Sequence, residues 1–257
     1  MLEVTSLTKL YAARAAVKDL SFKVKSGEIL GLVGPNGAGK TTTMRTVAGI
    51  IPATEGTITV SSFDIRSAPI EAKRRLAFVP DDPNLFTNLT VFEHLEFTAE
   101  LYGCAPGWRD DAARILAELE MTDRASSTAS ELSRGMRQKV AIACAFLHSP
   151  SLLMLDEPLT GLDPRGIRTL YAMLRESAQK GAAVIVSSHL LSQIETLCTQ
   201  FLIVREGRAL AIGTKDEIRL QFPHLGGAAS LEDIFFHATE APARGALAVP
   251  PAEHHSS

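Results

Sequence analysis

Two acidic pairs follow short apolar stretches of this 257-residue sequence. The first pair, Asp81 and Asp82, closes the segment LAFVPDDP, and the second, Asp156 and Glu157, closes LLMLDEP. Carboxylates at the end of a buried strand are typical positions for a metal ion or an activated water. The two pairs are therefore competing candidates for catalytic carboxylates.

A glycine-rich segment supplies a third chemical group. GPNGAGKT, residues 34–41, fits the pattern G-x-x-x-x-G-K-[ST] between the apolar run ILGLV and a stretch of helical composition. Its backbone N–H groups and the following helix N-terminus would face phosphate oxygens, with Lys40 at the β- and γ-phosphates and the Thr41 hydroxyl on Mg²⁺. A turn that binds nothing is the alternative, disfavoured by the flanking strand and helix. The residues predicted to bind nucleotide here are Gly34, Pro35, Asn36, Gly37, Ala38, Gly39, Lys40, Thr41 and Thr42.

The two acidic pairs differ in how the preceding strand ends. In LLMLDEP the apolar run reaches Asp156 unbroken, so we expect Asp156 to hold Mg²⁺ through its water shell and Glu157 to accept the proton of the attacking water. In LAFVPDDP, Pro80 separates the strand from the acids, and a proline cannot donate to a sheet ladder. Asp81 is therefore expected in a loop, and the catalytic pair is predicted at 156–157, with a solvated turn as the alternative.

Two more polar residues precede or follow predicted elements. Ser133, in LSRGMRQK, lies just before a helix, where its side chain and the free amides could receive an anion, although a simple N-cap explains it equally well. His189 ends VIVSSH, where a γ-phosphate would lie, although a lone histidine there is more often structural.

The pattern of elements places these groups in an α/β fold. Residues 2–33 alternate like strands, and strands then alternate with helices, which implies a parallel sheet covered on both faces. An all-helical stretch, about 85–148, is interpreted as an inserted subdomain. Residues 241–257 are rich in Ala, Pro and small residues and are predicted to be a disordered tail.

Composition excludes some classes of function. The net charge of −3 and the absence of a long basic tract argue against nucleic acid as a main partner. The three cysteines are predicted to be free thiols in a reducing compartment. The acidic N-terminus does not fit a signal peptide, and the longest uncharged stretch is too short to span a membrane, so the chain is not expected to cross a bilayer alone.

Read in order, GPNGAGKT, LSRGMRQK, LLMLDEP, TGLDP and SSH resemble the nucleotide-binding domain of ATP-binding-cassette (ABC) transporters. The resemblance covers about residues 2–240 and implies a single ATP-binding domain over 1–240. It implies a P-loop NTPase (RecA-like) core with a mainly parallel sheet, an N-terminal antiparallel β subdomain and an inserted α-helical subdomain.

The resemblance also assigns roles to individual residues. LSRGMRQK is similar to the signature motif, whose Ser133 and Gly135 would meet the γ-phosphate held by Lys40 of a partner, and Tyr11 matches an aromatic that stacks on adenine, with an edge-strand tyrosine as the alternative. The assigned residues are Lys40, Glu157 and His189 for catalysis, Ser133, Arg134, Gly135 and Gln138 for the signature, and Gly161, Leu162 and Asp163 for the D-loop.

Two positions depart from the family pattern. Arg134 stands where many members have a second glycine. Asp81 stands where the family usually has Gln, or sometimes Glu, which contacts Mg²⁺ and the attacking water in a loop that faces the membrane subunit. Asp is shorter than Glu and cannot donate as Gln does. Asp81 is accordingly a third metal candidate beside Thr41 and Asp156.

The segments LTVFEHLEFTAELYG, DEPLTGLDP and SLEDIFFHAT resemble the bacterial exporter branch, in which ATPase and membrane spans are separate chains. The resemblance predicts an ATP- and Mg²⁺-dependent ATPase, dimerising head to tail with a second copy or a paralogous ATPase, bound to permease subunits at the cytoplasmic face of the membrane. The alternatives are a soluble ABC ATPase not coupled to transport and a regulatory clamp that hydrolyses ATP weakly. No residue selects a substrate.

Overall fold

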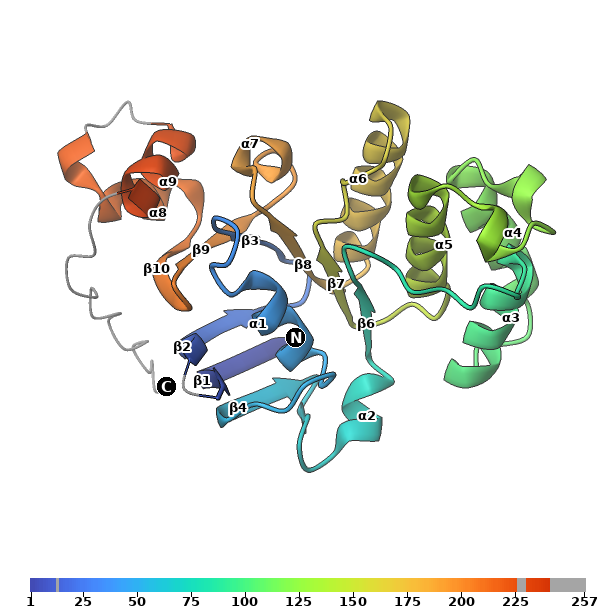
Figure 1. Ribbon diagram of the computed structural model, residues 1–257, viewed down its shortest axis with the longest axis horizontal. Helices are drawn as coiled ribbons and strands as arrows, with labels where there is room; N and C mark the ends of the chain where they lie inside the picture. The colour runs from blue at the N-terminus through green and yellow to red at the C-terminus, as the bar shows by residue number, and fades with distance from the viewer. Residues whose placement is uncertain (13, 226–229, 241–257) are drawn as a thin grey trace.

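The computed structural model describes residues 1–12, 14–225 and 230–240. The predicted tail, 241–257, lies outside the described residues. Two sheets and the helices packed on them make up the described chain, with one sheet of four strands and one of six (Figure 1). This arrangement confirms the predicted fold class.

The four-stranded sheet has the order β2-β1-β4-β5 and contains the N-terminal segment. Its strands are β1 (Leu2–Tyr11), β2 (Arg14–Val24), β4 (Glu55–Val60) and β5 (Phe63–Asp64). Each neighbouring pair is antiparallel. The N-terminal antiparallel sheet expected from the resemblance is therefore present.

The six-stranded sheet has the order β10-β9-β3-β8-β7-β6. Neighbours from β9 to β6 pair in parallel, and only β10 pairs antiparallel, with β9. The strands are β3 (Ile29–Val33), β6 (Leu76–Val79), β7 (Leu152–Asp156), β8 (Ala183–Ser188), β9 (Gln200–Arg205) and β10 (Arg208–Gly213). The ends of β3, β7 and β8 thus meet at one edge, as the motifs require.

The central strands are apolar on both faces because both faces are covered. In β3, Ile29 and Val33 belong to a core cluster that continues into α-helices 3 to 6, whereas Leu30 and Leu32 belong to a second cluster shared with the antiparallel sheet. Side chains of a strand point alternately to opposite faces, so a strand between two layers needs an unbroken apolar run. The run ILGLV meets that need.

The helices flank the large sheet. Helix α1 (Lys40–Val47) follows β3, and α6 (Pro164–Gln179) follows β7. Helices α3 (Val91–Tyr102), α4 (Trp108–Glu118) and α5 (Arg134–Leu147) lie together at one end of the molecule (Figure 1). They fill the stretch that was expected to be helical, and its status as a subdomain stays an interpretation.

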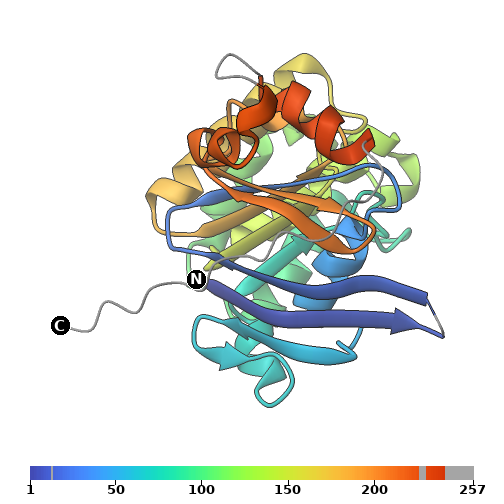
Figure 2. The ribbon, with the colours of Figure 1, turned by 90° about the vertical axis from the view of Figure 1, so that its left-hand side faces the viewer.

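Four short or late helices were not expected from the sequence. They are α2 (Pro69–Lys73), α7 (Leu191–Ile194), α8 (Lys215–Gln221) and α9 (Leu231–Glu240). In α9, Leu231, Ile234 and Phe235 are buried in the main core cluster. Figure 2 shows α8 and α9 beside the β9–β10 hairpin, and Figure 1 shows them at the end of the molecule opposite α3–α5.

The three cysteines are free thiols, as predicted. Burial raises the pKa of Cys144 to about 11 and of Cys198 to about 12, and it also raises the pKa of the half-buried Cys104. Among the residues that the structure describes, none of the helices combines the length and apolar character that crossing a bilayer requires.

Candidate active site

The phosphate loop joins the end of β3 to the start of α1, and two of its glycines have no room for a side chain. A Cβ on Gly34 would lie 2.3 Å from the carbonyl oxygen of Val204. A Cβ on Gly39 would lie 2.5 Å from the carbonyl oxygen of Ala16, and Gly39 has a φ of 105°. The close approach of β9 and β2 therefore demands glycine at both positions.

The N-terminus of α1 suits an anion. No side chain caps it at Gly39, and its first turn carries no acidic residue. Its first amides and the positive end of its dipole are thus available to phosphate oxygens. Lys40 is 6% exposed, and its Nζ donates to the carbonyl oxygen of Gly34 at 2.7 Å. The loop fits a nucleotide phosphate chain.

Lys40, Glu157 and His189 come together at the ends of β3, β7 and β8. Lys40 Nζ lies 3.4 Å from Glu157 Oε1, and His189 Nδ1 lies 2.9 Å from Glu157 Oε2. The Glu157 side chain is 16% exposed and that of His189 is 42% exposed. A carboxylate held between a cation and an imidazole can accept a proton from a water placed over the phosphate loop.

Asp156, at the end of β7, is 1% exposed. Ser187, opposite it in the β7–β8 register, donates its hydroxyl proton to Asp156 Oδ1. The same hydroxyl oxygen accepts from the backbone N–H of Glu157 at 3.0 Å. Ser187 therefore holds both carboxylate residues in place. Sequence reasoning missed it, because only the pairing register of two strands reveals the contact, although the motif SSH contains the residue.

The donors near the phosphate loop suit a hard cation. The buried Asp156 carboxylate and the Thr41 hydroxyl are oxygen donors, which Mg²⁺ prefers, and Mg²⁺ normally completes its shell with waters and substrate phosphates. Within the described part of the chain, no group of three or more His, Cys, Asp or Glu side chains could hold a metal ion alone. The protein groups thus fit a metal that arrives with a nucleotide.

The adenine and signature residues occupy contrasting environments. Tyr11 is 49% exposed at the end of β1, and the ammonium of Lys9 lies over its ring, 5.2 Å from the ring centroid. Ser133 caps α5, its hydroxyl oxygen accepting from the backbone N–H of Met136 at 3.3 Å, which is the simpler of the two readings. Gln138 is 1% exposed, with no hydrogen-bond partner for its amide among the described residues. Their predicted nucleotide contacts remain predictions.

The D-loop residues lead into α6. Asp163 is its N-cap, with Oδ1 accepting from the backbone N–H of Gly166 at 2.7 Å. Leu162 packs at the edge of the main core. Gly161 has a φ of 83°, and a Cβ on Gly135 would lie 2.3 Å from its carbonyl oxygen. The signature and the D-loop of one chain are therefore in backbone contact.

Asp81 is separated from the strand end by Pro80, as predicted, and lies in the loop after β6. Its Oδ1 accepts a hydrogen bond from Arg134 Nη2 at 3.1 Å, and the two side chains are 48% and 49% exposed. The structure thus brings together the two positions that depart from the family pattern, and the predicted metal contact of Asp81 stays a prediction.

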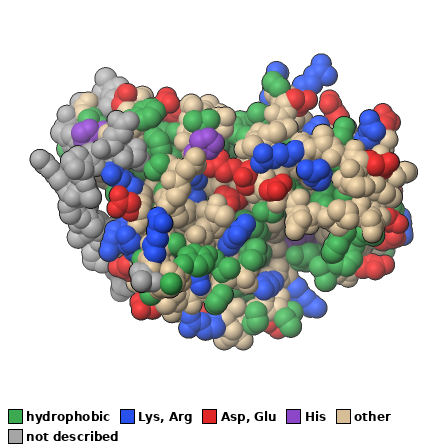
Figure 3. Space-filling view, in the orientation of Figure 1, with side chains coloured by type: hydrophobic (Ala, Val, Ile, Leu, Met, Phe, Trp, Pro, Cys, Tyr) green, Lys and Arg blue, Asp and Glu red, His purple; other side chains and the backbone are tan. Residues whose placement is uncertain are grey.

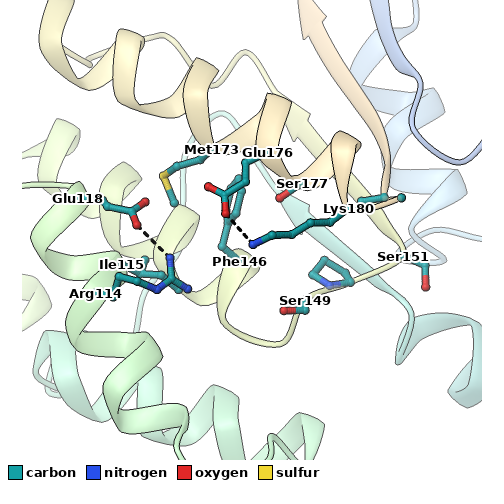
Figure 4. Close-up of a pocket in the computed structure, with 13 residues that line it drawn as sticks. Arg114, Ile115, Glu118, Phe146, Ser149, Ser151, Met173, Glu176, Ser177 and Lys180 are labelled. Carbon is teal, nitrogen blue, oxygen red and sulfur yellow. Dashed lines mark hydrogen bonds and ion pairs between the residues drawn. The ribbon is translucent and has the colours of Figure 1, made fainter.

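Figure 3 shows acidic side chains gathered near the centre of one face, over the ends of β7 and β8. A separate pocket of about 260 Å³ lies between α4, the end of α5 and the end of α6 (Figure 4). Its charged lining residues are mutually paired, Arg114 with Glu118 at 2.9 Å and Lys180 with Glu176 at 2.6 Å. The chemistry therefore centres on the phosphate loop and not on this pocket.

The family model described as "ABC transporter" matches residues 17–160, which include the phosphate loop, the segment LSRGMRQK and the carboxylates of Asp156 and Glu157. The chain belongs to the ABC transporter family. It is accordingly an ABC transporter ATP-binding subunit and an ATPase.

Curated relatives of this ABC subunit extend the match over most of its length. It is 36% identical over 241 residues to the ABC-type transporter ATP-binding protein EcsA of Bacillus subtilis, covering 93% of this chain and 97% of EcsA. It is 36% identical to the linearmycin resistance ATP-binding protein LnrL of the same organism, covering 85% and 70%. It is 34% identical to the Nod factor export ATP-binding protein I of Burkholderia orbicola, covering 82% and 70%.

Solved structures agree with the fold. An ATP-binding subunit of an ABC transporter superposes with a TM-score of 0.89 at 38% identity, covering 93% of this chain and 99% of the other. A dimeric post-hydrolysis structure of the cassette MJ0796, bound to ADP and Pi, superposes with a TM-score of 0.74 at 24% identity, covering 83% and 98%. The second likeness supports the fold alone.

Proposed function

We propose that this ABC ATPase is the motor subunit of a bacterial exporter, working as a head-to-tail dimer on separate permease subunits at the cytoplasmic face of the membrane. The observation that carries the proposal is the cluster of Lys40, Glu157 and His189 over an uncapped α1 N-terminus. That cluster is an arrangement for hydrolysing a phosphate chain, since it combines an anion site with a base.

The residues divide the work of hydrolysis. Lys40 and the loop amides bind the phosphates, and Asp156 with Thr41 would hold Mg²⁺. When bound, Mg²⁺ neutralises negative charge on the phosphate oxygens. Glu157 accepts the proton of the attacking water, and His189, hydrogen-bonded to it, orients its carboxylate. Ser133 and Gly135 of a second copy approach the γ-phosphate from the other side.

An exposed apolar surface supports the membrane partner. Phe86, Phe97 and Leu101 are 57%, 46% and 61% exposed, and the rings of Phe86 and Phe97 lie 5.5 Å apart, edge to face. Figure 3 shows hydrophobic side chains gathered on the side of α3. The patch follows the loop that carries Asp81, and apolar patches of this kind mark contacts with other proteins.

The relatives favour export over import. One is named for linearmycin resistance and one for Nod factor export, and both names describe removal of a compound from the cell or protection against it. Those two names refer to different compounds, so substrate choice is assigned to the permease.

The proposal is tested with the variant Glu157→Gln, which keeps the size of the side chain but removes the base. We expect turnover to fall by about 10²- to 10⁴-fold, the range for loss of general base catalysis. With ATP and Mg²⁺ the variant should elute from size exclusion at twice the monomer mass.

The double variant Lys40→Ala, Glu157→Gln is the matched control and should stay monomeric, since it lacks the phosphate-binding lysine. Hydrolysis by Glu157→Gln at the wild-type rate would contradict the assignment of Glu157 as the catalytic base. Wild-type turnover together with no ATP-dependent dimer of Glu157→Gln would contradict the proposed head-to-tail dimer.

A further inference from the structure

The ion pair between Asp81 and Arg134 joins segments that are 53 residues apart in the chain. Asp81 lies in the acidic loop, residues 80–83, and Arg134 lies in the signature segment, residues 132–139. The neighbouring Asp82 is exposed and forms no ion pair with any residue that the structure describes. The contact is therefore specific to one of two adjacent carboxylates.

The position of Arg134 makes a negative partner useful. Arg134 is the first residue of α5, a 14-residue helix whose first turn contains no acidic residue. A cation at a helix N-terminus is disfavoured by the helix dipole, and an anion there is favoured. Asp81 supplies that negative charge from a different part of the chain.

The other end of the arginine meets a third segment. The Cγ atom of Arg134 would lie 3.9 Å from a Cβ built on Gly161, and Gly135 is in backbone contact with the same glycine. Arg134 therefore packs its apolar stem against the D-loop while its guanidinium reaches the acidic loop. The acidic loop, the signature segment and the D-loop therefore meet at one side chain.

We propose that Asp81 is a positioning residue, which fixes Arg134 and thereby ties the acidic loop to the signature segment and the D-loop of the same chain. This inference rests on the proposed function, because the signature segment and the D-loop act on nucleotide only when two copies pair.

The role differs from a metal contact in what it predicts. If Asp81 acts only by positioning Arg134, its loss has no further effect once Arg134 has been replaced. If Asp81 contacts Mg²⁺, only its own loss changes the Mg²⁺ requirement. The two roles are thus separable by pairs of substitutions.

The test uses the full chain in two backgrounds. In the Glu157→Gln background, the ATP concentration for half-maximal dimerisation is measured. In the catalytically intact background, kcat, KM and the Mg²⁺ concentration for half-maximal activity are measured. Asp81→Asn and Arg134→Gln should each raise the ATP concentration for dimerisation by about 2- to 5-fold, the size of one exposed ion pair. Both should lower kcat and leave KM and Mg²⁺ half-saturation within error.

The double variant Asp81→Asn, Arg134→Gln should be no worse than Arg134→Gln alone in dimerisation and in kcat, because Asp81 acts through Arg134 and the two effects are therefore not additive. Asp81→Arg alone places two cations together and should be worse than Asp81→Asn. The matched control Asp82→Asn changes the neighbouring acid and should behave as wild type.

A double variant clearly worse than Arg134→Gln alone would overturn the proposal, as would a rise in Mg²⁺ half-saturation confined to Asp81→Asn. Failure of the proposed function would give a different result. In that case the Glu157→Gln variant would form no ATP-dependent dimer even with Asp81 and Arg134 unchanged.

Discussion

Glu157 carries an unusual backbone for a residue with a side chain. Its φ is 46°, in the left-handed region that costs an ordinary residue about 1–2 kcal/mol. The conformation is held by the hydrogen bond from its N–H to Ser187 and by the contacts of its carboxylate with Lys40 and His189. The Ser187 hydroxyl thus helps to determine where the Glu157 carboxylate lies.

Removing the Ser187 hydroxyl should therefore impair catalysis. Ser187 is 0% exposed, so no bulk water reaches its position. Ser187→Ala therefore removes the hydrogen bonds that the hydroxyl makes with Asp156 Oδ1 and with the Glu157 N–H, and nothing replaces them. We expect kcat to fall by about 10- to 100-fold, the usual effect of losing a supporting hydrogen bond to a metal or catalytic group, with a higher Mg²⁺ half-saturation. ATP turnover against Mg²⁺ concentration measures both.

Ser188→Ala is the matched control for that experiment. Ser188 is also buried, but its hydroxyl donates to the carbonyl oxygen of Leu190 and contacts neither carboxylate. It should keep the wild-type Mg²⁺ dependence. An equal shift of Mg²⁺ half-saturation in both variants would show that general destabilisation, and not the Asp156 contact, is responsible.

Motifs made the phosphate loop, Asp156, Glu157 and His189 predictable, because each ends or begins an element whose pattern is local. The contacts of Ser187 and Arg134 were not predictable in that way. The first depends on the register of two strands, and the second joins residues 53 positions apart. A local sequence pattern does not reveal contacts between residues that are far apart in the chain.

At the scale of elements, long helices and strands were predictable from a local sequence pattern, and the shortest helices were not. The buried strand ILGLV is an unbroken apolar run, and the amphipathic helices α3, α4 and α5 show a helical period, so a window of residues reveals each of them. Helices α2 and α7 have five and four residues, too few to display a period of 3.6, and they form because tertiary packing buries Ala72 in one and Leu191 and Ile194 in the other.

Helices α3 and α5 meet at a stacked pair of rings. Tyr102 and His148 lie with ring centroids 3.8 Å apart and ring planes at 18°. Burial lowers the pKa of His148 below its ordinary value of 6.5. The folded protein thus favours the neutral imidazole, and protonation has to act against this packing.

This contact predicts a loss of stability in mild acid. With a folded pKa below the unfolded value, His148 binds more protons in the unfolded state, so stability falls as the pH drops from 6.5 through the folded pKa. His148→Phe keeps a ring for the stack and removes the titration. Urea unfolding at pH 7.5 and 5.5 should show a smaller pH-dependent loss in the variant, and identical losses would refute the prediction.

On the scale of the whole molecule, two core clusters lie on opposite faces of one parallel sheet. Both clusters contain side chains from β3, β6, β7, β8 and β9. Because the two clusters share these strands, neither can open without disturbing the other. The C-terminal α9 belongs to the same unit, since Leu231, Ile234 and Phe235 are 0%, 1% and 7% exposed within the larger cluster.

We therefore expect α9 to unfold together with the rest of the chain. Ile234→Ala should lower the free energy of unfolding by about 2–5 kcal/mol, the range for a buried large-to-small change, while unfolding remains a single transition. The exposed Glu232 on the same helix is the control, and Glu232→Ala should change stability by no more than about 0.5 kcal/mol. Circular dichroism and tryptophan fluorescence should give coincident transitions. A separate early transition in Ile234→Ala would show that α9 folds independently.

The raised pKa values of the three thiols make the chain a convenient background for site-specific labelling. Only a thiolate reacts with a maleimide dye, and with pKa values of about 11 and 12 the thiols of Cys144 and Cys198 are almost wholly protonated at neutral pH. A single replacement, at the half-buried Cys104, leaves a chain in which an introduced surface cysteine reacts first. Fluorophores placed near the signature segment would then follow the closing and opening of two copies in real time.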